Sequence, residues 1–456
     1  MVGRRKETNP ARLGQSAVWL LSVMLLLGAC SPHLEIYPKL ESLARQGKYE
    51  QAAKLVEEKR DTYAERNAVL YNLDRGILYH YAGKYEESNK AFEAAERRMD
   101  ELFTESIARQ TGAFLSSDNT LPYRGEDFET VVINVFRALN YVQLADPESA
   151  LVEARKVNQK LEFINSKYPE DKRNAYREDA FARLLAGVLY EMGGTRDDVN
   201  DAFISNRKAV QIYQGDFSKR YRTDAPDVLK SNLLTTAGFM GREELDAARK
   251  TFPGIKMLSL AEKQGRAQLF FVHLAGQGPV KVEDAIHAVM PDGYLLRIAF
   301  PRYARRGYAI RSSSITVDGK LAALLEPAAP LGRIAIQNLK DRKGRIAAKA
   351  IARATSKYLA TKVAEKAAED RGGATAGLLT RLAGNVAAAA SEQADLRAWQ
   401  LLPDQILIGR VLVEPGEHEI AAEFHGGSGG AYARKSLGKV KLKAGETRFF
   451  ILHTNR

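Results

Sequence analysis

A four-residue motif repeats in the first half of the chain. The sequence GKYE at positions 47–50 recurs at positions 83–86, and each copy lies between two segments with apolar residues at helical spacing. A fixed period of this length predicts stacked pairs of helices, because each pair has an apolar face that only a neighbouring pair can cover. The N-terminal half is therefore restricted to an α-helical repeat.

Four units of this kind can be placed, with turns at Gly47, Gly83, Asp146-Pro147 and Gly193-Gly194. Small residues recur where the two helices of a pair would cross: Ala44, Ala52, Gly76, Ser88, Ala95, Ala138, Ala150, Ala154, Gly187, Ala202 and Ala209. The period is close to the ~34 residues of tetratricopeptide (TPR) repeats. We therefore predict a TPR-like domain over residues 30–215, followed by a helical linker over residues 216–265.

The first helix of each pair would line a concave surface, and this surface is apolar. It includes Leu73, Ile77, His80, Tyr81, Val135, Phe136, Leu139 and Val142. Tyr81 and Phe136 are the candidate binding residues on it. Two interpretations remain open: a groove for a helix or tail of a partner, or a surface that packs against later helices of the same chain.

An insertion over residues 99–128 separates the second unit from the third, and its turn-forming residues predict a loop. Three carboxylates lie at its end, Glu126, Asp127 and Glu129. Paired carboxylates in the segment 118–129 could hydrolyse a glycosidic bond of peptidoglycan. Acidic residues are also favoured at the start of a helix by its dipole, which is the structural interpretation.

The second half of the chain, residues 266–456, is β-rich. Short runs of β-branched and aromatic residues bounded by turns predict strands at 269–272, 294–300, 314–317, 405–408, 418–424 and 447–452, with 334–336 as a further one. The pattern favours an antiparallel β sandwich or barrel. The whole chain is thus an α+β multidomain protein.

An alanine-rich segment over residues 341–398 interrupts the β-rich domain. Its apolar residues form two stripes at helical spacing, Ile351, Tyr358, Leu359 and Val363 in one and Leu378, Leu382 and Val386 in the other. These predict an inserted helical hairpin whose two helices pack together. The second stripe is too short to cross a bilayer.

A basic cluster follows the strand predicted at 294–300. It contains Arg302, Arg305, Arg306 and Arg311, interleaved with Tyr303 and Tyr308 and without an acidic residue. Arginine combined with tyrosine suits the recognition of phosphate or carboxylate groups, so the four arginines are candidate binding residues. A solvated turn is the alternative.

Motifs for catalysis, cofactors and metals are missing from the sequence. The run 426–430 matches the pattern of a nucleophile elbow, but it lies between two predicted strands, where such an elbow cannot form. There is no phosphate loop, dinucleotide fingerprint or zinc-binding helix motif. We therefore predict a protein that is not an enzyme, with no catalytic residue, cofactor or metal.

The N-terminus has the features of a secretory signal over residues 1–29: a basic start and an apolar stretch at 17–27. The signal ends at Leu27-Gly28-Ala29-Cys30, which resembles the lipobox of bacterial lipoproteins. That resemblance implies that the thiol of Cys30, the only cysteine, carries a diacylglycerol and that the new amino terminus is acylated. Ser31, in place of an aspartate, implies the outer membrane.

The mature chain as a whole resembles a family of outer-membrane lipoproteins of Gram-negative bacteria. The residues that carry this resemblance are the lipobox and the segments 71–76, 123–129 and 396–403. It implies a periplasm-facing lipoprotein with N-terminal TPR-like repeats and a C-terminal β domain. The basic balance of the chain, formally +12, then favours envelope components over nucleic acid.

Two functional hypotheses follow from the sequence. The first is a lipid-anchored, non-enzymatic scaffold that binds another envelope protein or a cell-wall polymer through the repeats and the β domain. The alternative is a peptidoglycan-active hydrolase that uses the carboxylates of the segment 118–129. The sequence does not identify the partner or the oligomeric state.

Overall fold

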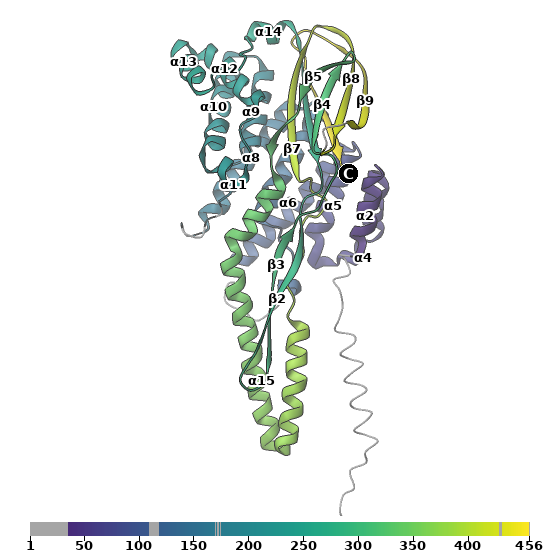
Figure 1. The fold of residues 1–456 in the computed structure, drawn as a ribbon, viewed down its shortest axis with the longest axis vertical. Helices are drawn as coiled ribbons and strands as arrows, with labels where there is room; N and C mark the ends of the chain where they lie inside the picture. Colours follow the sequence, from purple (N-terminus) through teal and green to yellow (C-terminus); the bar gives the residue numbers. More distant parts are fainter. Residues whose placement is uncertain are drawn as a thin grey trace, which may run out of the picture.

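The computed structural model describes residues 35–108, 118–168, 170, 173, 175–427 and 431–455. The predicted signal peptide and Cys30 lie outside these residues. The described chain is a mixed α+β structure in which helices, two large sheets and a long projection are arranged around one another (Figure 1).

The first half of the described chain is helical. Its α-helices are α2 (Tyr37–Arg45), α3 (Tyr49–Glu58), α4 (Arg60–Tyr63), α5 (Ala68–Tyr81), α6 (Tyr85–Ala108), α7 (Asp127–Gln143), α8 (Pro147–Ser166), α9 (Ala180–Gly193), α10 (Arg196–Ile212), α11 (Ser218–Tyr221), α12 (Asp227–Met240), α13 (Arg242–Thr251) and α14 (Leu260–Gly265). Three short elements of other helical types are η2 (Glu65–Asn67), η4 (Asp118–Thr120) and η6 (Tyr213–Phe217).

Consecutive helices pack in pairs at the predicted small residues. A Cβ atom added to Gly76 on α5 would lie 2.4 Å from the ring of Phe92 on α6, so only glycine allows this approach. Ser88 on α6 donates a hydrogen bond to the carbonyl oxygen of Gly76, at 2.7 Å. The predicted turn at Asp146 is confirmed as well, because its side chain caps α8 by accepting from the amide of Ser149.

The predicted linker, residues 216–265, contains four helices. Of these, α12 packs against both α10 and α13, so the helical layer continues through it. The predicted insertion loop is partly wrong, because α6 extends to Ala108 and covers its first ten residues. Helix propensity of a charged, alanine-containing segment is enough to lengthen this helix by several turns.

The described residues of the second half contain ten strands. These are β1 (Ala267–Ala275), β2 (Val280–Val289), β3 (Leu295–Ala304), β4 (Ser312–Val317), β5 (Lys320–Leu324), β6 (Glu326–Ala329), β7 (Gln405–Val413), β8 (Gly416–His425), β9 (Ala431–Leu442) and β10 (Thr447–Thr454). They form one sheet of order β10-β1-β7-β6, another of order β5-β4-β8-β9, and a separate β2-β3 hairpin.

Strand β1 is the central element of the molecule, and it is buried on both faces. Phe270, Val272 and Leu274 join the hydrophobic core of the helices, whereas Leu269 and Phe271 join a second core shared with β4 and β8. Because side chains alternate along a strand, this division makes the first sheet a layer between the helices and the second sheet.

The prediction of a purely antiparallel arrangement is wrong at one pair, since β1 and β10 run parallel. The long chain segment between these strands allows the crossover that parallel pairing requires. The strand predicted at 334–336 is also wrong, because these residues lie in helix α15 (Leu331–Ser391). Ile334 and Ala335 are buried there against the helical core, which explains their apolar character.

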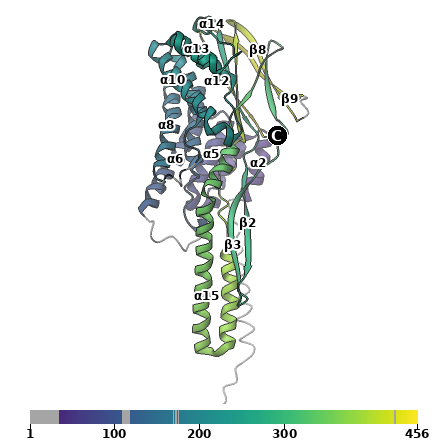
Figure 2. The same cartoon turned by 60° about the vertical axis from the view of Figure 1, so that its left-hand side comes forward.

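Helix α15 bends at Gly373, where φ is 76°, into two arms that lie side by side (Figures 1 and 2). The predicted helical hairpin is therefore present, although its first helix begins ten residues earlier than predicted. Together with the β2-β3 hairpin, the arms project far from the rest of the molecule. We refer to residues 280–304 and 341–392 as the stalk, and to the remaining described residues as the body.

The prediction of how the arms pack is wrong. Leu359, Val363 and Leu382, expected between the arms, are 56%, 71% and 54% exposed. The arms meet instead at small residues, since a Cβ atom on Gly384 would lie 2.7 Å from the methyl group of Thr361. The large aliphatic side chains of the stalk therefore face outward.

Candidate functional site

The face of α5 and α7 that was predicted to line a concave surface is covered by the chain itself. Phe136 is fully buried, and its ring lies 5.8 Å from that of Trp399. The hydroxyl of Tyr81 donates to the carbonyl oxygen of Leu401 at 3.0 Å, and its ring stacks on His453 at 3.5 Å. Of the two interpretations of this face, packing within the chain is the one observed, so Tyr81 and Phe136 do not line an open groove.

The covering segment, residues 393–404, follows the stalk. We call it the captive segment, because its backbone is hydrogen-bonded from several elements. Asn119 donates to the carbonyl oxygen of Ala394 at 3.1 Å, Lys281 donates to that of Arg397 at 2.8 Å, and the amide of Gly278 donates to that of Leu402 at 2.8 Å. The captive segment thus holds the place that a peptide would take in an open groove.

The carboxylates at the start of α7 have structural partners. Glu126 and Glu129 form a capping box, in which each side chain is bonded to the backbone of the other residue. Glu129 is fully buried and accepts from the hydroxyl of Tyr123 at 2.6 Å. Burial raises the pKa of Glu129 to about 7. These residues occupy the helix start that the structural interpretation predicted.

Glu126 also belongs to a buried group of charges where the stalk meets the body. Its carboxylate forms ion pairs with Lys281 of β2 and with Arg342 of α15, and the side chains of Glu126 and Lys281 are only 8% and 3% exposed. The sequence did not indicate Lys281, because strand β2 was not predicted, or Arg342, because the segment 341–398 was interpreted only by its apolar stripes. Their partners come from positions more than 150 residues away.

A cavity of about 550 Å³ lies beside this group. Its wall combines cationic side chains with apolar ones from the segment 121–126, α6, β2, β3, α15 and the captive segment. The cations are Arg124, Lys281, Arg342, Arg345, Lys349, Arg353 and Arg397, and the carboxylates are Glu105, Glu126 and Asp395. The cavity therefore has seven cationic residues and three carboxylates in its wall. We refer to it as the cationic cavity.

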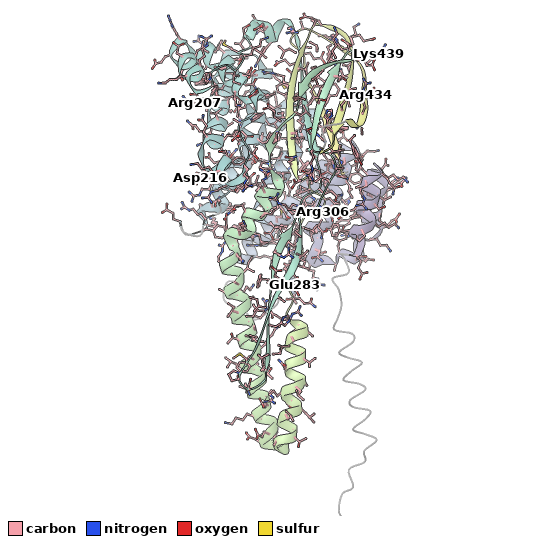
Figure 3. The ribbon with its side chains drawn as sticks, in the orientation of Figure 1. Arg207, Asp216, Glu283, Arg306, Arg434 and Lys439 are labelled. Atoms are coloured by element: carbon pink, nitrogen blue, oxygen red, sulfur yellow. The ribbon has the colours of Figure 1, made fainter. Side chains whose placement is uncertain are left out.

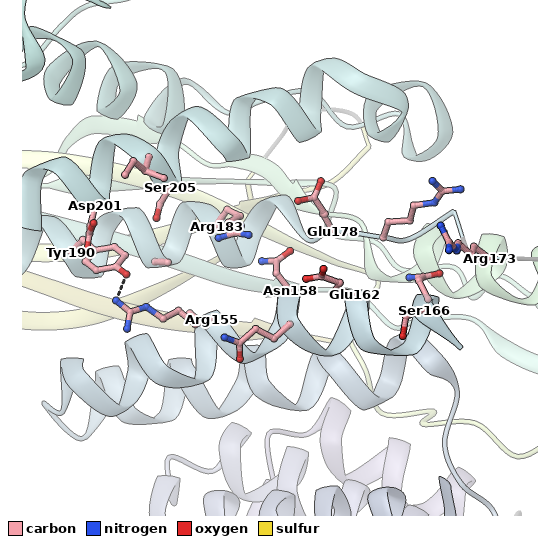
Figure 4. A pocket seen from close by; sticks show the side chains of 16 residues that line it. Arg155, Asn158, Glu162, Ser166, Arg173, Glu178, Arg183, Tyr190, Asp201 and Ser205 are labelled. Carbon is pink, nitrogen blue, oxygen red and sulfur yellow. Dashed lines mark hydrogen bonds between the residues drawn. The ribbon is translucent and has the colours of Figure 1, made fainter. Parts of the chain in front are cut away.

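A second cavity, of about 740 Å³, lies between α8 and the helices α9 and α10 (Figure 4). Its wall carries Arg155, Arg173, Arg177 and Arg183, but also Glu162, Glu178 and Asp201. Arg155 donates to the hydroxyl of Tyr190 across it. Charges of both signs are nearly balanced here, so this cavity has no clear preference for a charged ligand.

The predicted basic cluster does not act as one surface. Arg306 lies at the junction of stalk and body (Figure 3), where it donates to the carbonyl oxygens of Gly278 and Gln400 and pairs with Glu41 at 2.6 Å. These contacts hold elements of the chain together, which is a structural role for Arg306. A long guanidinium with five donors can satisfy several buried acceptors at once.

The other three arginines of the cluster are exposed. Arg302 pairs with Asp284 of the neighbouring strand at 2.8 Å, and Arg311 lies over the ring of Tyr308 at 4.9 Å. Arg305 lies in the connection between β3 and β4. Among the described residues no group of three or more potential ligands could hold a metal ion.

Comparisons with known proteins give little information about this chain. No family model matches it, and no curated protein matches it. One solved structure that is similar is BtubC (BKLC) from P. vanneervenii, at 16% sequence identity, which covers 54% of this chain and 90% of that chain with a TM-score of 0.33. A similarity at this level supports no conclusion about function, so the site is interpreted from its own geometry.

Proposed function

We propose that this chain is a lipid-anchored, non-enzymatic scaffold of the outer membrane that faces the periplasm and binds another envelope protein through its stalk. In this proposal Cys30 carries the lipid, and the TPR-like repeat and the β sandwich form a body that supports the stalk. The observation that carries the proposal is the outer surface of the stalk.

The exposed positions of both arms are uncharged over most of their length. From Gly344 to Ala364, and again from Ala374 to Ser391, every exposed residue is apolar, small or a threonine or serine. The exposed residues of the β2-β3 hairpin between Ala285 and Leu295 have the same character, with His287 as the one ionisable residue among them. An apolar surface of this extent marks a contact with a partner.

Away from the tip of the stalk, several of its charged residues face inward. Lys362 pairs with Asp292 of the β2-β3 turn at 2.6 Å, and Arg381 donates to the backbone carbonyl of the same residue at 3.2 Å. Arg353 donates to Glu392 between the two arms, at 3.0 Å. A helix in water normally places charges outward and aliphatic side chains inward. This reversed pattern supports a stalk that is covered by another molecule.

Strand β2 favours a protein as that molecule. It pairs only with β3 among the described strands, so its other edge presents free backbone groups. Hydrocarbon cannot bond such groups, and leaving them unpaired in a bilayer would cost several kcal/mol each. A protein can supply both an apolar face and a strand for this edge. None of the described helices combines the length and apolarity needed to span a membrane.

A photo-crosslinking amino acid placed in living cells tests this proposal. Leu359 and Leu382 are suitable positions on the stalk, and Ile204 on α10, 47% exposed, is the matched position on the body. We expect protein adducts of defined mass at the two stalk positions and none at Ile204. A second substitution, Val363→Asp, should abolish these adducts. Adducts to lipid alone, or equal labelling at all three positions, would contradict a protein partner on the stalk.

A further inference from the structure

The cationic cavity has more positive charge than its own carboxylates balance. Glu126 is shared by Lys281 and Arg342. Asp395 pairs with Arg397 at 2.7 Å. Glu392 behind the wall pairs with Arg353, and Asp127 accepts from the hydroxyl of Tyr168, so five carboxylates face seven cations when both are included.

The two other arginines of the cavity wall have no ion-pair partner among the described residues. In the part of the chain that the structure describes, Arg124 and Arg345 form no ion pair. One Nη atom of Arg345 is buried without a hydrogen-bond acceptor, although its guanidinium lies over the ring of Tyr168 at 4.5 Å.

Bringing these guanidinium groups together is unfavourable without an anion. Burial, and then the neighbouring charges of Arg124 and Arg345, lower the pKa of Arg342 to about 9. Buried polar and charged groups in proteins are ordinarily satisfied, so a buried donor without a partner points to a ligand that completes it. The ligand that would do so here is anionic.

We propose that the cationic cavity binds an organic phosphate, with the phosphate group between Arg124, Arg342 and Arg345. The guanidinium fork matches the oxygens of phosphate in a bidentate manner. A phosphate monoester carries nearly two negative charges, which balances the excess better than a single carboxylate does. The organic part of the ligand would contact Leu121, Leu339 and Ile346, which also line the cavity. Its volume of about 550 Å³ is suited to a small molecule.

Binding of phenyl phosphate to purified protein that begins at Ser31 tests this inference. This protein retains every described residue and has no lipid, so its result does not depend on anchoring or on the partner of the stalk. We expect phenyl phosphate to raise the melting temperature and to bind at least about tenfold more tightly than benzoate in calorimetry. Equal affinity for the two anions, or no binding of phenyl phosphate, would overturn the proposal.

Two variants test the position of the phosphate. Arg124→Gln and Arg345→Gln should each weaken phenyl phosphate binding by about tenfold or more. Each substitution removes a charge that repels its neighbours, so neither should lower the melting temperature of the ligand-free protein. Substitution of an arginine with a purely structural role would lower it. Arg371→Gln at the exposed tip of the stalk is the control and should bind as the unchanged protein does. Unchanged affinity in both cavity variants would place the phosphate elsewhere and overturn the assignment.

The phosphate could belong to a soluble molecule or to a lipid headgroup, and a third measurement distinguishes them. If the protein cosediments with phosphatidylcholine vesicles that contain phosphatidic acid, and Arg124→Gln abolishes this cosedimentation, the cavity also binds the phosphate of a lipid headgroup. Binding of phenyl phosphate without such cosedimentation identifies a soluble source. Vesicle binding that persists in Arg124→Gln and Arg345→Gln, in the absence of phenyl phosphate binding, contradicts the proposed site.

Discussion

Trp399 donates its backbone N–H to the Oε1 atom of Glu129 at 2.7 Å, although the two residues are 270 positions apart. Glu129 also accepts from the hydroxyl of Tyr123 at 2.6 Å and from the amide of Glu126 at 3.0 Å. One buried carboxylate therefore closes the start of α7 and fixes the captive segment at the same time. The helical repeat and the β-rich half are joined into one unit by this contact and by the packing around it.

The joined core gives the first prediction. Phe136→Ala should leave a cavity beside Trp399 and lower the free energy of unfolding by about 3–5 kcal/mol. Trp399 is the only tryptophan after the predicted signal peptide, so its fluorescence reports on this site directly. We expect the midpoint of a urea titration followed by tryptophan fluorescence to move to a lower concentration.

Phe163→Ala is the matched control for that measurement. Phe163 lies on α8 and is 51% exposed, so its removal should change the free energy of unfolding by less than about 0.5 kcal/mol. If the two variants had the same midpoint, the captive segment would not be part of the cooperative core.

The close approach of α5 and α6 gives a second prediction. Gly76→Ala would place a methyl group 2.4 Å from the ring of Phe92, so the two helices must separate. We expect a loss of about 1–3 kcal/mol in the free energy of unfolding. Gly344→Ala is the control, because a Cβ atom there meets open space within a helix, and it should stabilise the protein slightly. Chemical denaturation of both variants measures the difference.

The helix pairs of the first half could be predicted because their signals are local. Gly76, Gly83 and Asp146 act through contacts within one helix pair. Each lies where the motif spacing predicted it, either in the contact between two helices or in the turn that joins them. Strands were predicted where β-branched residues cluster between turns. Strand β2 was missed, because the sequence from Val280 to Val289 mixes apolar, charged and histidine residues without clear alternation.

The stalk and the cationic cavity could not be predicted from the sequence. The stripes at Ile351, Leu359 and Val363 have the spacing of a buried face, and only the three-dimensional arrangement shows that alanines and Thr361 take that place. The cavity combines residues from seven separate segments. No local pattern indicates that Arg124 and Arg345 lie near each other.

The basic cluster provides a third prediction, since its members have different environments. Arg306→Gln leaves Glu41 and two backbone carbonyl groups without their cationic partner. We expect a loss of about 1–3 kcal/mol, because Arg306 and Glu41 are only partly buried and hydrogen bonds to a charged group contribute roughly this much. Arg305→Gln, at an exposed position of the same connection, should be nearly neutral. Equal melting temperatures for the two variants would refute the structural role of Arg306.

The proposed anchor gives a fourth prediction. Cys30→Ser should remove the acylation site, so that the protein remains an uncleaved precursor or becomes soluble in the periplasm. Metabolic labelling with a fatty-acid analogue, followed by membrane fractionation, measures both effects. Labelling that persists in Cys30→Ser would exclude this residue as the lipid attachment site.

The buried carboxyl of Asp74 gives the last prediction, which concerns pH. Asp74 is fully buried and accepts from the hydroxyls of Tyr37 and Tyr63, each at 2.8 Å. Burial raises its pKa to about 7, even though both hydrogen bonds act in the opposite direction. In the unfolded chain an aspartate ionises near ~3.9. Between these two pH values only the folded protein holds this proton, so Asp74 makes the free energy of unfolding fall as the pH rises.

The variant Asp74→Asn isolates this effect, because an amide keeps an acceptor for the tyrosines but does not titrate. The free energy of unfolding of the unchanged protein, relative to that of Asp74→Asn, should decrease by about 3 kcal/mol between pH 4 and pH 8. Other groups, including Glu129, titrate in both proteins, so their contributions largely cancel in the difference between the two free energies of unfolding. Asp146→Asn, which replaces a partly exposed helix cap, should show no such change between pH 5 and pH 8. A constant difference across this range for Asp74→Asn would mean that the carboxyl of Asp74 ionises normally, and that its burial does not control its protonation.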